Sequence, residues 1–132
     1  HGPRTEALNW LFWQMGSAPY LGGGFGHFYA YAPEKFAYPI NRFAMETKRQ
    51  LDVLNRHLAT RAHMAGDDYS IADIAIWPWL RSWQNQGIDW ADYPALKAWF
   101  DRIGARPAVQ RGVQVLSVDG WAMFRRRAPG VD

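Results

Sequence analysis

The chain of 132 residues contains no cysteine. This absence excludes disulfide bonds, thiolate metal ligands and a cysteine nucleophile from the polypeptide. Any thiol chemistry in which the chain takes part must therefore be supplied by a ligand or by another domain.

Motifs for metal binding and for nucleophilic catalysis are also missing. His27, His57 and His63 do not have the spacing of paired ligands on one helix, and no carboxylate accompanies them at a metal-ligand spacing. No serine stands in the strand-turn-helix context of a hydrolase nucleophile. We therefore expect neither a metal site nor a catalytic residue in this chain.

Long apolar runs are a third absence. No stretch approaches the roughly 20 apolar residues that a membrane-spanning helix needs, and no signal peptide is visible. The net charge of +3 comes from basic residues interspersed with acidic ones. These features predict a soluble, cytoplasmic protein that binds neither membranes nor nucleic acid. The alternative interpretation, a nucleic-acid-binding domain, is supported only by the pI of 9.4 and by the basic run Arg125–Arg127. This run lies in a tail that we place at residues 116–132.

Aromatic side chains, by contrast, are abundant, with eight Trp, six Tyr and seven Phe. Because each aromatic ring buries a large area, a chain with 48% hydrophobic residues can form one compact domain. We place the core of this domain at about residues 5–115.

The spacing of the apolar residues predicts helices and no strand. The first helix is expected from Thr5 to Gly16 and the longest from about Pro39 to Arg61. Between them, residues 20–29 alternate glycine with aromatics and lack the strand-to-helix context of a phosphate-binding loop, so we expect a linking loop. Further helices are expected after Tyr93 and from Pro107. The sequence therefore predicts an all-α bundle of about five to six helices.

Two signals for the start of a helix precede the apolar run at residues 74–80. Ser70 and Asp73 have the spacing of a capping box, in which each side chain accepts a hydrogen bond from the backbone N–H of the other residue. Tyr69 and Ile74 have the spacing of a hydrophobic staple. The apolar run itself predicts a helix buried on most of its sides. We assign all four residues to folding and none to chemistry.

Arg42 stands near the start of the long helix, where the helix dipole disfavours a cation. The spacing leaves two interpretations open. The guanidinium can hold a ligand carboxylate through two hydrogen bonds, or it can form an exposed i, i+4 pair with Glu46 worth a few tenths of a kcal/mol. Composition and spacing alone favour the ion pair.

Four blocks of the sequence, in order, resemble the C-terminal helical domain of bacterial glutathione transferases. The most similar branch is the Nu class, whose members are disulfide-bond reductases. The blocks are Leu8–Gly16, Leu21–Phe28, Ser70–Asp73 with Trp77–Trp79, and Arg106–Val109.

This resemblance implies an enzyme of two domains. A thioredoxin-like N-terminal domain would bind most of the glutathione and supply the activating hydroxyl group, and the helical domain would form the substrate side of the cleft and contribute to a homodimer. Because the chain begins at His1 without a methionine, we expect it to be a segment of a longer protein. The segment by itself is not expected to catalyse the glutathione-dependent thiol-disulfide exchange expected of its parent.

The resemblance also implies roles for individual residues. Arg42 occupies a position at which relatives contact glutathione. Gln14 and Met15 are candidates for a contact with a second glutathione, because some relatives carry Gln at the position of Met15 and one step along a helix rotates a side chain by about 100°. The candidate walls of the electrophile or disulfide pocket are Trp13, Tyr20 and Phe25.

A different class of function stays open. Helical domains of this shape also serve as non-catalytic docking modules for protein-protein assembly. The glycine-rich aromatic segment and Arg42 favour the enzyme.

Overall fold

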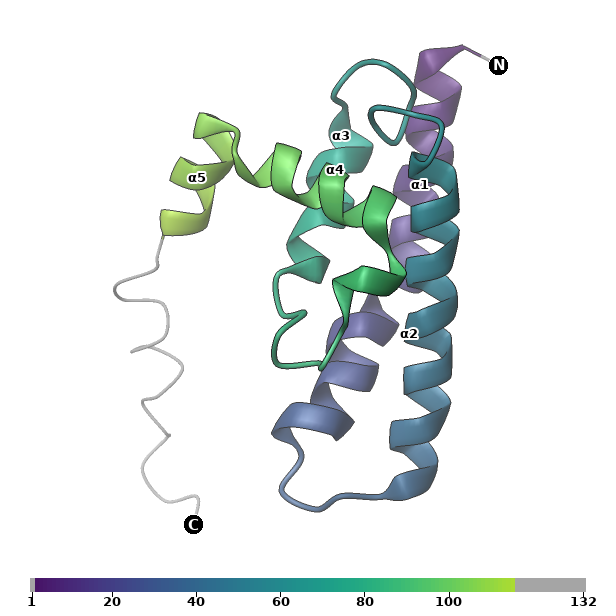
Figure 1. The fold of residues 1–132 in the computed structure, drawn as a ribbon, viewed down its shortest axis with the longest axis vertical. Helices are drawn as coiled ribbons and strands as arrows, with labels where there is room; N and C mark the ends of the chain where they lie inside the picture. The colour runs from purple at the N-terminus through teal and green to yellow at the C-terminus, as the bar shows by residue number, and fades with distance from the viewer. Residues whose placement is uncertain (1, 116–132) are drawn as a thin grey trace. The chain divides into compact units, whose positions relative to one another are not determined.

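The computed structural model describes residues 2–115, which form helices and contain no β-strand (Figure 1). The all-α class expected from the sequence is confirmed. The chain divides into two compact units, His1–Asp101 and Arg102–Asp132. The proposed tail at 116–132, with its basic run, lies outside the described residues. Within the described range, no helix is both long and apolar enough to cross a membrane.

The helical elements follow one another closely along the chain. They are α1 (Pro3–Ser17), the π-helical segment η1 (Tyr20–Tyr31), α2 (Ala37–Leu58), α3 (Ile71–Ile76), the 3-10 segments η2 (Trp77–Leu80) and η3 (Trp90–Asp92), α4 (Pro94–Gly104) and α5 (Pro107–Gln114).

The predicted ends of the first two helices are partly wrong. α1 begins at Pro3, with Gly2 rather than Thr5 as its N-cap, and it continues through Gly16. Proline is suited to the first turn of a helix because the N–H that it lacks has no intrahelical partner there. α2 begins at Ala37 and ends at Leu58, and so is displaced by two or three residues from its expected limits.

The glycine-rich segment is not the predicted loop. Residues 20–31 form η1, which packs against α2 (Figure 1). A Cβ on Gly24 would lie 2.7 Å from Cδ1 of Phe43, and a Cβ on Gly22 would lie 2.8 Å from Cζ3 of Trp79. The glycines therefore admit aromatic rings against the helix backbone, and this packing outweighs their low intrinsic helix propensity.

The capping box at the start of α3 is present, and Asp73 does more than complete it. Oδ2 of Asp73 accepts hydrogen bonds from the backbone N–H of Ser70 at 2.9 Å and from its hydroxyl at 3.2 Å. Oδ1 accepts from the backbone N–H of Met64 at 3.0 Å and from Nε1 of Trp99 at 2.8 Å. Asp73 is fully buried, so one carboxylate joins the turn before α3, α3 itself and α4.

The prediction that this helix is buried on most sides is wrong. Ala72, Ile76 and Leu80 form a buried face, whereas Ile71 and Ile74 are each about half exposed. The ring of Tyr69 lies 6.1 Å from the ring of His63 in an edge-on contact, and its packing against Ile74 stays a prediction. α3 gives way to the 3-10 segment η2 just before Pro78, because proline cannot donate the next helical hydrogen bond.

We predict opposite effects of alanine at two neighbouring glycines. Gly24→Ala should lower the free energy of unfolding by about 1–3 kcal/mol, because the new methyl group overlaps the ring of Phe43. Gly23→Ala is the matched control, since a Cβ there meets nothing within 4 Å. It should leave stability unchanged or raise it by up to about 1 kcal/mol through helix propensity. Urea unfolding followed by circular dichroism measures both, and equal losses would contradict the packing role of Gly24.

A second prediction concerns the two halves of the capping box. Ser70→Ala should cost about 1 kcal/mol, the usual value for a lost N-cap. Asp73→Ala should cost at least about 2 kcal/mol, because it removes both oxygens and leaves the buried N–H groups of Met64 and Trp99 without an acceptor. The comparison is made by urea unfolding at neutral pH. A smaller loss for Asp73→Ala than for Ser70→Ala would show that the contacts to Met64 and Trp99 contribute little.

Candidate functional site

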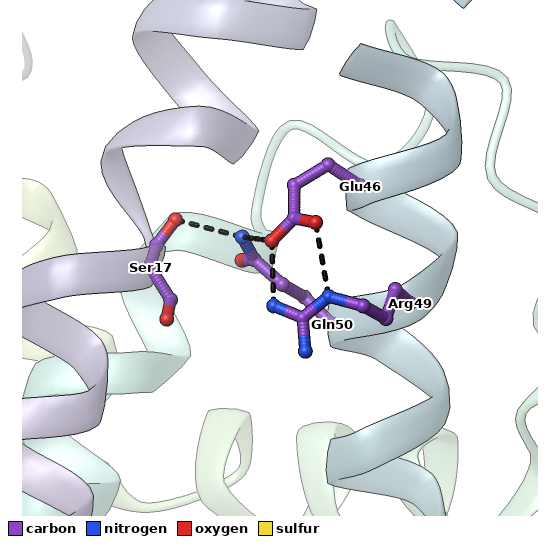
Figure 2. Close-up of polar contacts among 4 residues, drawn as sticks. All are labelled: Ser17, Glu46, Arg49 and Gln50. Carbon is purple, nitrogen blue, oxygen red and sulfur yellow. Dashed lines mark hydrogen bonds and ion pairs between the residues drawn. The ribbon is translucent and has the colours of Figure 1, made fainter. Parts of the chain in front are cut away.

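Arg42 is exposed in the first turns of α2, and its expected ion pair with Glu46 is not formed. Glu46 is bound instead by Arg49, whose Nε lies 2.9 Å from Oε2 and whose Nη2 lies 2.6 Å from Oε1 (Figure 2). Within residues 2–115, no hydrogen bond or ion pair is found for Arg42. Its guanidinium is therefore available to an anionic ligand.

The Glu46–Arg49 pair belongs to a small polar cluster that joins α2 to the end of α1. Nε2 of Gln50 donates to the carbonyl oxygen of Ser17 at 2.9 Å and to Oε1 of Glu46 at 3.1 Å (Figure 2). Gln50 is fully buried, so its amide holds the carboxylate in place from the inner side while Arg49 holds it from the outer side. This arrangement keeps Glu46 away from Arg42.

The hydrogen bonds from Arg49 lower the pKa of Glu46 from 4.5 to about 2. Desolvation opposes this change, and the Gln50 amide and the charges of Arg49 and Arg42 add to it. Glu46 is thus an anion at neutral pH and a poor candidate for a general acid or base.

A cavity of about 230 Å³ lies beside the first turns of α2. It is lined by Pro19, Tyr20, Gly23, Gly24 and Phe43. Phe43 follows Arg42 directly in the chain, and its ring stacks on that of Phe28 at 5.5 Å and lies 6.0 Å from that of Tyr20. An aromatic hollow and an unpaired guanidinium on the same turn of α2 suit a ligand with a carboxylate at one end and an apolar or sulfur-containing group at the other.

The three residues expected to form the pocket walls are not brought together. Tyr20 lines the cavity beside Phe43. Phe25 is buried, stacks on Tyr29 at 5.0 Å and lines a different cavity. Trp13 packs edge-on against Trp10 at 5.4 Å and lines neither of these two cavities.

The structure separates the two candidates at the end of α1. Gln14 is buried, whereas Met15 is 64% exposed. A ligand approaching this turn of α1 would therefore meet Met15 and not Gln14. A glutathione contact for either residue stays a prediction.

Sequence reasoning missed Phe43 and the glycines 23 and 24 as lining residues. The helical periodicity placed Phe43 on the core stripe, and the glycines were assigned to a loop. No local signal could have identified them, since the cavity forms only where η1 packs against α2. Among the described residues, no group of three or more His, Asp or Glu side chains could hold a metal ion.

Comparison with known proteins gives consistent matches. The family model for the glutathione S-transferase C-terminal domain matches residues 37–102. The chain is 57% identical over 120 residues to an uncharacterized GST-like protein of Streptococcus mutans, covering 85% of this chain and 46% of that protein. It is 52% identical over 124 residues to the disulfide-bond oxidoreductase YghU of Escherichia coli, covering 89% and 43%.

A solved structure agrees with these relatives. The glutathione transferase YghU from Streptococcus pneumoniae, complexed with glutathione, superposes with a TM-score of 0.80 at 55% identity and covers 86% of this chain and 46% of that one. The chain therefore spans about half the length of the proteins that it matches.

The pKa of Glu46 leads to a prediction about pH. Because the pKa is about 2 in the folded chain and 4.5 in the unfolded one, the stabilisation from ionised Glu46 is fully present above pH 4.5 and is lost as the pH falls towards 2. Glu46→Gln should lower the free energy of unfolding by about 1 kcal/mol near pH 6, since the exposed Arg49 is screened by solvent. Near pH 3 the difference from the wild type should shrink.

The exposed pair Asp52–Arg56 on the same helix provides the control. Asp52→Asn should change stability by only a few tenths of a kcal/mol at either pH. Urea unfolding of the three proteins at both pH values tests the assignment, and a pH-independent effect of Glu46→Gln would contradict it.

Proposed function

Because the chain belongs to the glutathione S-transferase family through its C-terminal domain, we propose that it is the helical domain of a glutathione-dependent disulfide-bond oxidoreductase. The observation that carries this proposal is the exposed guanidinium of Arg42, which has no partner within residues 2–115 and directly precedes Phe43 of the aromatic cavity in the chain. Glutathione is a tripeptide with two carboxylates and a thiol, so it offers both an anion for Arg42 and a sulfur group for the hollow at Tyr20 and Phe43.

In this proposal the reaction is thiol-disulfide exchange. The thiolate of glutathione attacks one sulfur of a disulfide, a new S–S bond forms, and the other sulfur leaves as a thiolate. The chain has no cysteine, so none of the three sulfurs belongs to it, and all are supplied by ligands or by another domain. The role of its own residues is to bind and orient: Arg42 holds a glutathione carboxylate, and the aromatic cavity excludes water from the apolar part of the substrate.

The remaining parts of the enzyme are proposals that follow from the relatives. A thioredoxin-like N-terminal domain, in the half that the chain does not span, would bind most of the glutathione and supply the activating hydroxyl group. The complete enzyme would be a homodimer. It would work in the cytoplasm, the compartment in which glutathione keeps thiols reduced.

Arg42→Ala in the parent enzyme should weaken glutathione binding roughly tenfold, because it removes a charge-assisted hydrogen bond to a carboxylate. Isothermal titration calorimetry measures the affinity directly. Arg56→Ala is the matched control, since Arg56 is an exposed arginine on the same helix that pairs with Asp52. It should leave the affinity unchanged.

Two results would oppose the proposal. Equal affinities of the wild type and Arg42→Ala would remove Arg42 from the site. Disulfide reduction by the 132-residue chain alone, in the absence of the N-terminal domain, would show that the chemistry does not depend on the missing half.

A further inference from the structure

A second cavity, of about 300 Å³, lies between η1, α2 and the turn at residues 86–93. On α2 it is lined by residues Ala44, Thr47, Lys48 and Leu51. With 3.6 residues per turn, these positions lie on the side of the helix opposite to Arg42, Glu46 and Arg49. The cavity also shares no lining residue with the hollow at Tyr20 and Phe43, so it is separate from the proposed glutathione site.

Aromatic rings form much of its wall. Phe25 and Tyr29 stack at 5.0 Å with an angle of 25° between their planes, and Tyr93 lies on the cavity wall contributed by the turn. Gly87 has a φ of +65° and comes so close to Tyr29 that a Cβ would lie 3.0 Å from its hydroxyl oxygen. The turn thereby holds Tyr29 against the cavity. Flat walls of this kind suit a planar ligand.

One buried polar group in the wall has no partner. Thr47 is 2% exposed, and its hydroxyl makes no hydrogen bond in the structure. A buried hydroxyl without a partner costs roughly as much as a lost hydrogen bond. The hydroxyl is closed to solvent in this structure, so a polar ligand in the cavity would remove that cost once the Thr47 side chain turns towards it.

The charges around the cavity are predominantly negative. Asp89 and Asp92 line it, against the single cation Lys48. One oxygen of Asp89 accepts a hydrogen bond from the backbone N–H of Ala91, which leaves its other oxygen and the Asp92 carboxylate for a ligand. Negative charge also acts on Tyr93 in the cavity wall. The pKa of Tyr93 is raised mainly by burial and further by the charges of Asp92 and Asp52. Two carboxylates and aromatic faces together favour a cation over an anion.

We propose that this cavity binds a small planar aromatic amine in its protonated form. The ring packs against Phe25, Tyr29 and Tyr93, a polar substituent bonds with the Thr47 hydroxyl, and the ammonium group lies at Asp89 and Asp92. An aromatic acid of the same size would place its carboxylate against these two aspartates and is disfavoured. The site is independent of the proposed glutathione chemistry, and its test does not require catalysis.

Three para-substituted phenols of similar size and different charge test the site on the 132-residue chain. Tyramine carries an ammonium group, para-ethylphenol is neutral, and para-hydroxyphenylpropionate carries a carboxylate. In a titration followed by amide chemical shifts in NMR, tyramine should give saturable shifts at residues 47 and 87–92. The neutral probe should bind about fivefold more weakly, the usual effect of one partly exposed charge pair, and the acid more weakly still. Equal binding of all three probes, or no saturable binding of tyramine, would overturn the proposal.

Variants make the assignment specific. Asp92→Asn should weaken tyramine binding about fivefold, whereas Asp68→Asn, which removes the same charge at an exposed turn away from the cavity, should not change it. Thr47→Val keeps the shape of the side chain and removes only the unpartnered hydroxyl, so it should weaken tyramine binding and preserve the fold. If Asp68→Asn weakened binding as much as Asp92→Asn, the attraction would be a property of the whole surface and not of this cavity.

Glutathione separates the two sites. Millimolar glutathione should leave tyramine binding unchanged, because Arg42 and the cavity lie on opposite sides of α2. Displacement of tyramine by glutathione would overturn the separate site and would leave the function of Arg42 unaffected.

Discussion

The buried carboxylate of Asp73 is the interaction on which the arrangement of residues 2–101 most depends. It accepts hydrogen bonds from Ser70, Met64 and Trp99, which belong to three segments. A charge buried in a protein interior is tolerated only when its oxygens are fully satisfied. The three segments must therefore meet in one geometry. Asn55 acts similarly at the start of α4, where its Oδ1 accepts from the backbone N–H groups of Ala95 and Leu96.

The position of η1 determines where two cavities of the chain lie. Its glycines let the backbone approach Phe43 and Trp79 closely, and Gln86 holds it from the other side through a hydrogen bond to the carbonyl oxygen of Leu21 at 2.6 Å. One cavity lies on the side of Tyr20 and Phe43, and the other on the side of Phe25 and Tyr29. A single irregular helix thus separates a candidate glutathione site from a site of different charge.

Charge placement along α2 follows from competition for one carboxylate. Arg42 and Arg49 are both within reach of Glu46 by helical spacing. Arg49 forms the ion pair because Gln50, which is hydrogen-bonded to Ser17, also donates to the Glu46 carboxylate from the inner side. The consequence for function is that Arg42, which directly precedes Phe43 of the aromatic cavity in the chain, has no partner in the described range. Spacing alone favours the ion pair of Arg42 with Glu46, which is wrong because the outcome depends on Ser17, which lies 33 residues from Gln50.

The sequence by itself determined the all-α class, the start of α3 at its capping box, the starts of α4 and α5 at Pro94 and Pro107, and the absence of any protein thiol. These features depend on residues within one or two helical turns of each other, so local hydrogen bonding and backbone restriction are enough to specify them. Only the tertiary structure decided that the glycine-rich segment is helical, that Gln14 is buried and Met15 exposed, and that Tyr20 and Phe25 line different cavities. Each of these outcomes depends on contacts between segments far apart in the chain, whose packing energy exceeds the local preferences of the residues involved.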